Sequence, residues 1–464
     1  MFDKDTYIQR RKQLTDHVNS GIILFLGNEE TGMNYRDNWY HFKQDSSFIY
    51  YIGLNQATLA AIIDVDAGTT TLYGNELTVD DIVWTGPLPS LASQAADKGI
   101  EHTAPFNHVV EALQAAQSKG RTIHFLPPYR DEHTLKLHHW LGLSTQEAEA
   151  GGSLELIQAI VAQREVKTEA ELVELDKAVD LTGDMHLAAM RTARAGIMEY
   201  QVAGAAHSTA VKGGGELSFP IICTTNGQTL HNHYHGNVIE ADRLMLVDCG
   251  AQISSHYAGD MTRTFPVNGT FSAKQAEVYE VLLKSHETAI AALKPGVPYK
   301  DVHLMAASVI FDGLKQLGLT KGDTEEAVSQ GVHALFFPHG LGHQMGLDVH
   351  DMENLGEVHV GYDGVAKSTQ FGLKSLRLGK ALKPGIVLTV EPGIYLIPEL
   401  IDIWRSEGKF TDFLNYDKLE GYKDFGGMRV EEDYAITDSG ARRLGKKVAT
   451  SIKDIEAIRQ ETLA

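Results

Sequence analysis

Cysteine is nearly absent from this chain. Only Cys223 and Cys249 occur among 464 residues, which excludes a disulfide framework. Such sparing use of cysteine is typical of a reducing compartment, so we expect a cytoplasmic protein. The sequence also lacks the run of roughly 18 apolar residues that crosses a membrane. Its first residues, MFDKDTYIQRRKQL, are charged and lack the apolar centre of a secretory signal, in agreement with that expectation.

Positive charge is also in short supply. The chain has 41 basic and 61 acidic residues, a formal net charge of −20. Nucleic acid and anionic membranes are therefore not expected as partners. A length of 464 residues exceeds one ordinary core and predicts two domains. We place their boundary at Gly151-Gly152-Ser153, which gives domains of residues 1–152 and 153–464.

The first domain is predicted to be α/β. Apolar and polar residues alternate at helical spacing over 108–118. Short β-prone runs bounded by glycine or acid predict strands at 21–27, 60–64 and 69–73. The aromatic segment 44–53 (QDSSFIYYIG) and Trp84 are more typical of a core or a subunit contact than of an active site.

The second domain is predicted to begin with helices. Thr168 and Glu171 form a potential capping box before apolar residues at helical spacing, and Gly213–Gly215 ends this helical region. Further helices are predicted from Ser272 and from about Lys300.

Two aspartates stand in a predicted hairpin. Arg243–Ala251 is an apolar run containing Asp248, and Asp260 begins a second β-prone run after a polar turn. Their even spacing of twelve fits side chains that meet on one face of the sheet. Each aspartate taken alone could instead be a turn residue at a strand end.

Two glutamates also occupy strand-like runs. Glu391 ends the apolar run IVLTV before Pro392-Gly393, and a buried carboxylate there requires a partner. Glu431 lies in FGGMRVEEDYAIT, where a continuous strand would place Arg429, Glu431 and Asp433 on one face and Glu432 on the other. The alternative is an Arg–Glu ladder on the surface.

Histidines gather in two stretches. His339, His343 and His350 lie in the glycine-rich segment HGLGHQMGLDVH, which is either a ligand-binding loop or a solvated one. In LHNHYHG, His231, His233 and His235 would share one face of a strand, and His231 is the stronger candidate because it follows an apolar residue. The other two could equally form a solvated edge.

Together these patterns predict a metal site. The candidate ligands are oxygen-rich and favour a hard divalent ion, Mn²⁺ before Zn²⁺, with Co²⁺ as a further alternative. Four carboxylates exceed the need of one ion and suit two ions about 3.5–4 Å apart that share a hydroxide nucleophile. The ligands are Asp248, Asp260, His343, Glu391 and Glu431.

The order Asp, Asp, His, Glu, Glu resembles the pita-bread metallopeptidases, the family of methionine aminopeptidase, aminopeptidase P and prolidase. The N-terminal half resembles the N-terminal domain of the Xaa-Pro peptidases, which methionine aminopeptidase lacks. The resemblance implies an α/β N-terminal domain followed by an α+β pita-bread catalytic domain. The matching segments are LVDCGAQISSHYAGDMTRTFPVNG, HGLGHQMGLDVHD, VLTVEPGIY and GGMRVEED, with QDSSFIYYIG and AAIIDVDAGTTTLYG in the N-terminal half.

The resemblance also implies roles within the site. Asp248 would bind one ion, His343 and Glu391 the other, and Asp260 and Glu431 both. Glu391 would also carry a proton. His231 and His350 would contact the substrate and the tetrahedral intermediate, and His339 would line the proline side. Arg429 would lie behind the metal ligands or face the substrate. The two aspartates are one residue further apart than is usual in the family, which points to an altered hairpin turn.

The expected activity is hydrolysis of the peptide bond before proline. The segment GLKSLRLGKALKPG resembles prolidase, whose matching arginine, here Arg377, would hold the free carboxylate of a dipeptide. A surface arginine between Lys374 and Lys380 is the alternative. Other readings are aminopeptidase P acting on longer peptides, a metal-free creatinase-like hydrolase, and a non-enzymatic binding module. The resemblance further implies a homodimer in which Trp84 borders the partner's site.

Overall fold

The computed structural model describes residues 2–463, which form two compact units. The first unit comprises the chain up to Arg164 together with Met352–His359, and the second comprises Glu165–Asp351 and the chain from Val360 onward. The expected boundary at 152 and 153 precedes helix α8 (Leu154–Arg164), which belongs to the first unit. No helix within residues 2–463 is long and apolar enough to cross a membrane.

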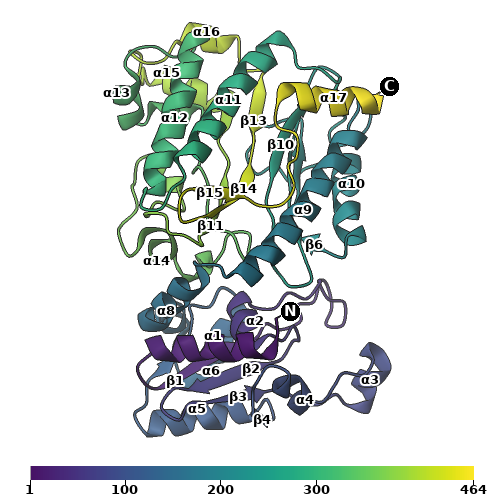
Figure 1. Cartoon of the computed structure of the whole chain (residues 1–464), viewed down its shortest axis with the longest axis vertical. Coiled ribbons are helices and arrows are strands. Elements are labelled where there is room, and N and C mark those ends of the chain that lie inside the picture. Colours follow the sequence, from purple (N-terminus) through teal and green to yellow (C-terminus); the bar gives the residue numbers. More distant parts are fainter. Residues whose placement is uncertain (1, 464) are drawn as a thin grey trace. The chain divides into compact units, whose positions relative to one another are not determined.

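A mixed five-stranded sheet forms the centre of the first unit (Figure 1). Its strand order is β4-β3-β2-β1-β5, with parallel pairs β3–β4 and β1–β5 and antiparallel pairs between β1, β2 and β3. The three strands predicted from the sequence are confirmed. The strands are β1 (Ile22–Leu26), β2 (Ala60–Asp64), β3 (Thr69–Tyr73), β4 (His102–Ala104) and β5 (Ile123–His124).

Eight helices of this unit surround the sheet or extend from it, and the helix expected at 108–118 is confirmed as α5. Every residue of α2, which covers most of the aromatic segment, is buried, so this segment belongs to the core as expected. The helices are α1 (Lys4–His17), α2 (Ser46–Ile52), α3 (Val79–Thr85), α4 (Leu91–Ala96), α5 (His108–Ser118), α6 (Asp131–Leu141), α7 (Thr145–Ala150) and α8.

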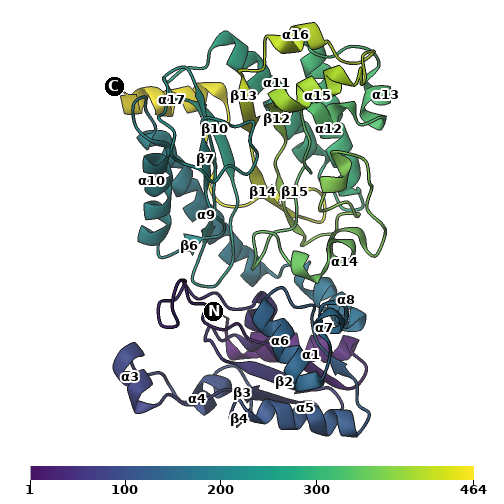
Figure 2. The same ribbon diagram turned by 180° about the vertical axis from the view of Figure 1, so that it is seen from behind.

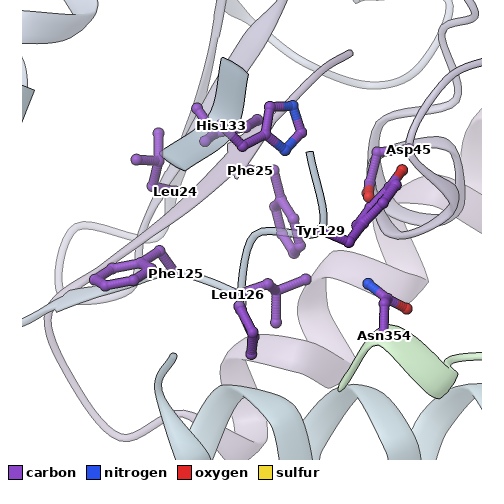
Figure 3. Close-up of a pocket in the computed structure, with 10 residues that line it drawn as sticks. Leu24, Phe25, Asp45, Phe125, Leu126, Tyr129, His133 and Asn354 are labelled. Atoms are coloured by element: carbon purple, nitrogen blue, oxygen red, sulfur yellow. The ribbon is translucent and has the colours of Figure 1, made fainter. Parts of the chain in front are cut away.

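The segment Met352–His359 joins the first unit although both its chain neighbours belong to the second. Its Asn354 faces a cavity of about 20 Å³ that is also lined by Asp45, Tyr129 and His133 (Figure 3). A space of this size holds one water molecule.

The second unit places short strands between two helical layers (Figures 1 and 2). Helices α9 and α10 pack together on one side, and α11 and α12 pack together on the other. The predicted capping box of Thr168 and Glu171 starts α9, and Ser272 caps α11. The helices are α9 (Glu169–Thr192), α10 (Glu199–Lys212), α11 (Ala273–Ala292), α12 (Tyr299–Gln316), α13 (Thr324–Ser329), α15 (Pro398–Ser406), α16 (Tyr416–Glu420) and α17 (Ile452–Leu463), together with the second half of α14 (Glu357–Tyr362), which begins in the first unit.

The strands of the second unit form four small sheets rather than one large sheet. Their orders are β10-β8-β7, β11-β14-β15, β12-β13 and β6-β9. The strands are β6 (Glu216–Leu217), β7 (Ile222–Thr224), β8 (Leu244–Asp248), β9 (Ala251–Gln252), β10 (Thr262–Pro266), β11 (Val387–Val390), β12 (Gly393–Leu396), β13 (Gly426–Arg429), β14 (Glu432–Ile436) and β15 (Ala441–Arg443).

Arg459 of α17 fastens the C-terminal helix to this unit. Its guanidinium is fully buried and donates to the carbonyl oxygens of Pro266 (3.1 Å), Val267 (2.7 Å) and Ala193 (2.6 Å), and also to Met190. One side chain therefore satisfies backbone carbonyls at the ends of α9 and β10 that would otherwise be buried without a donor.

We expect Arg459→Ala to lower the free energy of unfolding by about 3 kcal/mol or more, because it leaves several buried carbonyl oxygens without a hydrogen-bond donor. Denaturant unfolding followed by circular dichroism measures this loss. Arg194→Ala is the control, since Arg194 is exposed and donates only to the neighbouring Thr192 carbonyl at 3.4 Å. Equal losses in the two variants would contradict the anchoring role.

Candidate metal centre

One cavity of about 710 Å³ in the second unit gathers the predicted metal ligands and the predicted catalytic and substrate-binding residues. Their individual roles stay predictions, but their assembly from distant parts of the chain is a finding of the structure. The candidates that line it are His231, Asp248, Asp260, His339, His343, His350, Arg377, Glu391, Arg429 and Glu431.

The two aspartates come from the predicted hairpin, which is confirmed. Strands β8 and β10 pair antiparallel with Thr262 opposite Asp248, and Asp260 lies just before β10. The connecting turn closes with hydrogen bonds between Ile253 and the residues His256 and Tyr257. Both aspartates are buried, so neither is merely a polar turn residue.

The two glutamates lie at matching breaks in a pair of antiparallel strands. Strand β11 ends before Glu391 and β12 resumes at Gly393, while β13 ends before Val430 and β14 resumes at Glu432. The prediction that Glu431 lies within a continuous strand is therefore wrong. The chain changes its pairing partner at Glu431: β13, before it, pairs with β12, whereas β14, after it, pairs with β11.

At these breaks the backbone amides of the two glutamates form hydrogen bonds to the segments that carry the other predicted ligands. The Glu391 amide donates to the Leu341 carbonyl at 2.8 Å, and the Glu431 amide donates to the Thr262 carbonyl at 3.1 Å. Pro392 has no amide proton for the ladder. The interruption thus fixes the glutamates against the histidine loop and the aspartate hairpin.

The glycine-rich segment brings His343 against β11. A Cβ atom on Gly342 would clash with the Thr389 carbonyl, so only glycine permits this approach. The His343 Nδ1–H group donates to the Gln344 carbonyl at 3.0 Å. This leaves Nε2 available to bind a metal, 3.4 Å from Asp260 Oδ2 and 3.8 Å from Glu391 Oε1. His343 is buried, so the solvated-loop alternative does not hold for it.

The buried oxygens of this cluster fit a cation. Ligand atoms of Asp260, His343 and Glu431 lie within 4.8 Å of one another. Among residues 2–463, Asp248 Oδ1, Asp260 Oδ1 and Glu431 Oε1 are buried without a hydrogen-bond donor. Unpaired buried carboxylate oxygens are costly, and a divalent ion would satisfy them. The oxygen-rich donor set with one imidazole therefore matches a divalent metal.

Acid–base behaviour supports the same fit. Burial, together with the charge of Asp248, raises the pKa of Asp260 to about 8. Burial raises the pKa of Glu391 to about 7, partly offset by His343 and Arg429. Burial and the neighbouring carboxylates also hold the pKa of Glu431 well above its usual range. Without a cation, these groups retain protons because one guanidinium cannot balance the cluster.

Arg429 organises the wall of the cavity beside the cluster. It pairs with Asp248, and its Nε donates to the Thr262 hydroxyl at 3.0 Å. That hydroxyl donates to Glu431 Oε2 at 2.7 Å. Arg429 and Glu431 are both buried, so the alternative of a surface Arg–Glu ladder is wrong. Glu432 points away and pairs with Arg263, as the sequence predicted for the opposite face.

Tyr395, which the sequence reasoning missed, links Arg429 to His339. Arg429 Nη1 donates to the Tyr395 hydroxyl at 2.8 Å, and this hydroxyl donates to His339 Nε2 at 2.9 Å. His339 Nδ1–H donates to the Gly340 carbonyl at 2.8 Å. Burial and Arg429 lower the pKa of His339 to about 3, so it is a neutral ring with both nitrogens engaged. The apolar spacing of GIYL gives no sign of this polar role.

The other histidines occupy the open part of the cavity. The His350 ring lies over that of His343, with centroids 3.9 Å apart. The expected strand at 231–235 is not formed, because this segment is a turn followed by irregular chain. His231 and His233 nevertheless line the cavity, whereas His235 turns its Nε2 to the Ile221 carbonyl at 3.1 Å.

Comparison with known proteins agrees with this geometry. Residues 173–438 match metallopeptidase family M24, and residues 7–124 match the aminopeptidase P N-terminal domain. The chain is 31% identical to a Homo sapiens Xaa-Pro dipeptidase, covering 94% of this chain and 88% of that protein. It is also 31% identical to a probable Xaa-Pro aminopeptidase of Sordaria macrospora, covering 94% and 90%.

Among solved structures, zinc-substituted Escherichia coli aminopeptidase P in complex with product superposes with a TM-score of 0.82 at 25% identity, covering 99% of both chains. The expected architecture, an α/β N-terminal domain followed by a pita-bread catalytic domain, is thereby confirmed.

The raised pKa values predict proton release on metal binding. At pH 6 the metal-free protein holds protons on Asp260 and Glu391, whose pKa values are about 8 and about 7. Metal ligation requires ionised carboxylates, so Mn²⁺ displaces these protons. We expect calorimetric titration at pH 6, in two buffers of different ionisation enthalpy, to show release of about two protons or more, because the raised pKa of Glu431 adds to those of Asp260 and Glu391. Asp260→Asn lowers that number.

The stability of the metal-free protein follows from the same values. Folded Asp260 and Glu391 keep protons that the unfolded chain loses above its ordinary values of 3.8 and 4.5. Their contribution therefore favours folding at low pH and is lost as the pH rises from about 4 to about 8. The Tm difference between Mn²⁺-loaded and EDTA-treated protein should widen with pH. A constant difference from pH 5 to pH 8 would contradict this reasoning.

Proposed function

Because the chain belongs to metallopeptidase family M24, we propose that it hydrolyses the peptide bond before proline, with Xaa-Pro dipeptides as the preferred substrates. The observation that carries this proposal is the shared cavity. It contains the cluster of buried, unpartnered carboxylate oxygens and also Arg377, a cation suited to a free carboxylate. The names of the dipeptidase and aminopeptidase relatives support the substrate class.

The five predicted ligands would hold two divalent ions, with Mn²⁺ proposed as the native metal because most of the donors are carboxylate oxygens. Bound there, the ions supply an activated hydroxide and polarise the scissile carbonyl. His343 Nε2 faces Asp260 and Glu391 with its tautomer fixed by the Gln344 carbonyl, so it is preorganised as a ligand.

The other residues bind the substrate and move protons. Glu391 is the proton carrier, because its carboxylate lies in the cavity beside His343, where one of its oxygens can accept a proton and deliver it to the leaving imide nitrogen. His231 and His350, in the open part of the cavity, hydrogen-bond the developing oxyanion. His339 cannot carry a proton, since both of its nitrogens are engaged, and its ring borders the proline.

Arg377 distinguishes a dipeptide from a longer peptide. A guanidinium gains most from a free carboxylate and cannot form the same ion pair with an internal amide. The runner-up is an aminopeptidase P activity on Xaa-Pro-Yaa peptides, which the aminopeptidase relatives and the Escherichia coli aminopeptidase P structure favour.

We further propose a cytoplasmic homodimer. Three side chains of α3 are strongly exposed, with Val79, Val83 and Trp84 at 77%, 72% and 85%. Contiguous exposed apolar side chains of this kind mark contact surfaces. A second copy of the chain would cover them and place Trp84 beside the partner's cavity. The two buried free cysteines are consistent with a reducing compartment.

The first activity test compares Ala-Pro with Ala-Pro-Ala by chromatography, in Mn²⁺ and then in EDTA. We expect metal-dependent cleavage, with kcat/KM higher for the dipeptide. Arg377→Ala should lower kcat/KM for Ala-Pro about 30-fold or more, because it removes a charged partner of the carboxylate. Lys374→Ala is the matched control from the same segment, since Lys374 is exposed and does not line the cavity.

A preference for the tripeptide, together with equal effects of Arg377→Ala on both substrates, would establish the aminopeptidase reading instead. Activity that survives EDTA would overturn the metal-dependent mechanism.

The dimer is tested by light scattering coupled to size-exclusion chromatography. Wild-type protein should elute at twice the mass of one chain, and the double variant Val83→Ser with Trp84→Ser should elute as a monomer. Val173→Ser, at another exposed apolar position on α9, controls for general surface effects. A monomeric wild type would rule the dimer out.

A further inference from the structure

The segment that carries Arg377 is held in place by contacts on several sides. We propose that Tyr362 is a positioning residue for carboxylate recognition: its hydroxyl fixes the backbone beside Arg377 and so places the guanidinium at the cavity. This inference rests on the proposed role of Arg377.

Tyr362 ends helix α14 and acts on the residue next to Arg377. Its hydroxyl donates to the Leu376 carbonyl at 2.8 Å. Its ring lies against Gly379, where a Cβ atom would overlap it. The ring also borders a second cavity, of about 310 Å³, lined by Leu373 and Gly379 among others. Because close packing does not enclose the ring on every side, the hydrogen bond is needed to fix the loop.

Two glycines hold the same segment. A Cβ atom on Gly361 would clash with the Arg377 carbonyl, and the Gly361 carbonyl accepts from the amides of Gly379 and Lys380, both at 2.9 Å. Gly340 belongs to the histidine loop, and a Cβ atom there would lie 2.7 Å from Leu376 Cα. The Arg377 backbone is thus confined between the loop that carries His343 and the end of α14.

A buried ion pair anchors the C-terminal side of the segment. The Lys380 ammonium pairs with Glu165, and their side chains are 2% and 5% exposed. Lys380 is therefore not part of a basic surface stretch. The Lys380 carbonyl also accepts from the Tyr299 amide at 2.9 Å, which ties the segment to the start of α12. With this end fixed, the Tyr362 hydrogen bond governs the position of the preceding turn.

This arrangement separates substrate recognition from hydrolysis. Arginine has a long side chain whose free rotamers are lost on binding, so a fixed backbone lowers the cost of placing its guanidinium. Loosening that backbone weakens the carboxylate contact but leaves the metal ligands, which lie on other segments, in position. The expected signature is a raised KM for substrates with a free proline carboxylate, without a matching loss of kcat.

Tyr362→Phe tests this signature by removing only the hydroxyl. In Mn²⁺-loaded enzyme we expect the KM for Ala-Pro to rise about five-fold, the factor that corresponds to one typical hydrogen bond. The kcat for Ala-Pro should change less than two-fold. Ala-Pro-amide lacks the carboxylate, so its KM should change less than two-fold; where its turnover is too slow, its inhibition constant replaces KM.

The matched control is Tyr416→Phe, which removes a hydroxyl that likewise donates to a backbone carbonyl, that of Lys409 at 2.6 Å. It should leave both substrates unaffected. Thermal unfolding verifies that each variant is folded. A second variant, Lys380→Arg, keeps the positive charge but disturbs the other anchor, and it should show the same selective rise in KM.

The outcomes separate this inference from the proposed function. A selective rise for Ala-Pro supports the positioning role. The positioning role is overturned if Tyr362→Phe changes the KM for Ala-Pro and for its amide equally. It is also overturned if Tyr362→Phe changes neither KM while Arg377→Ala selectively impairs cleavage of Ala-Pro. Both outcomes leave the proposed function intact. If Arg377→Ala is not selective, carboxylate recognition by Arg377 is wrong and the role of Tyr362 falls with it.

Discussion

The second unit depends on one constraint, the burial of several carboxylates within a few ångströms of one another. Possible ligand atoms of Asp260, Glu431 and His343 lie within 4.8 Å of one another, and each of the two acids has an oxygen that no donor among residues 2–463 satisfies. Such a cluster is unstable unless protons or a cation neutralise it. Arg429 neutralises Asp248 directly and reaches Glu431 through the Thr262 hydroxyl. The remaining deficit of positive charge is what fits this site to a divalent cation.

Hydrogen bonds fix the ring tautomers of His339 and His343 and leave a nitrogen available only in the ring of His343. Both His339 and His343 donate from Nδ1 to a carbonyl of the next residue, Gly340 and Gln344 respectively. Only His343 keeps its second nitrogen facing the carboxylates, because Tyr395 occupies that of His339. Two rings four residues apart in one glycine-rich loop thus differ: His343 keeps a nitrogen available for a metal, and His339 is a neutral ring in the cavity wall. The difference arises from a tyrosine on another strand.

Chemistry and substrate recognition lie on different kinds of structure. The acids lie at the ends or breaks of paired strands, where ladder hydrogen bonds on both sides fix the backbone. Arg377 lies on a loop that is fixed by separate contacts from Gly361, Tyr362 and the Lys380–Glu165 pair. On the proposed assignment of Arg377, changes in this loop would alter recognition of the peptide carboxylate while the predicted metal ligands keep their positions.

Local sequence determined the features that local physics controls. Capping residues and apolar spacing fixed the helices from Thr168 and Ser272, and the aspartate hairpin followed from two apolar runs and a polar turn. The predicted ligand set follows from residue type and order together with the family resemblance, and the structure brings these residues into one cavity. Tertiary structure decided the rest. Glu431 lies in a break because its chain changes partners there, which depends on distant strands. The neutral state of His339 and the fixed position of Arg377 depend on Tyr395 and Tyr362, residues whose hydroxyl partners cannot be read from their neighbours in the chain.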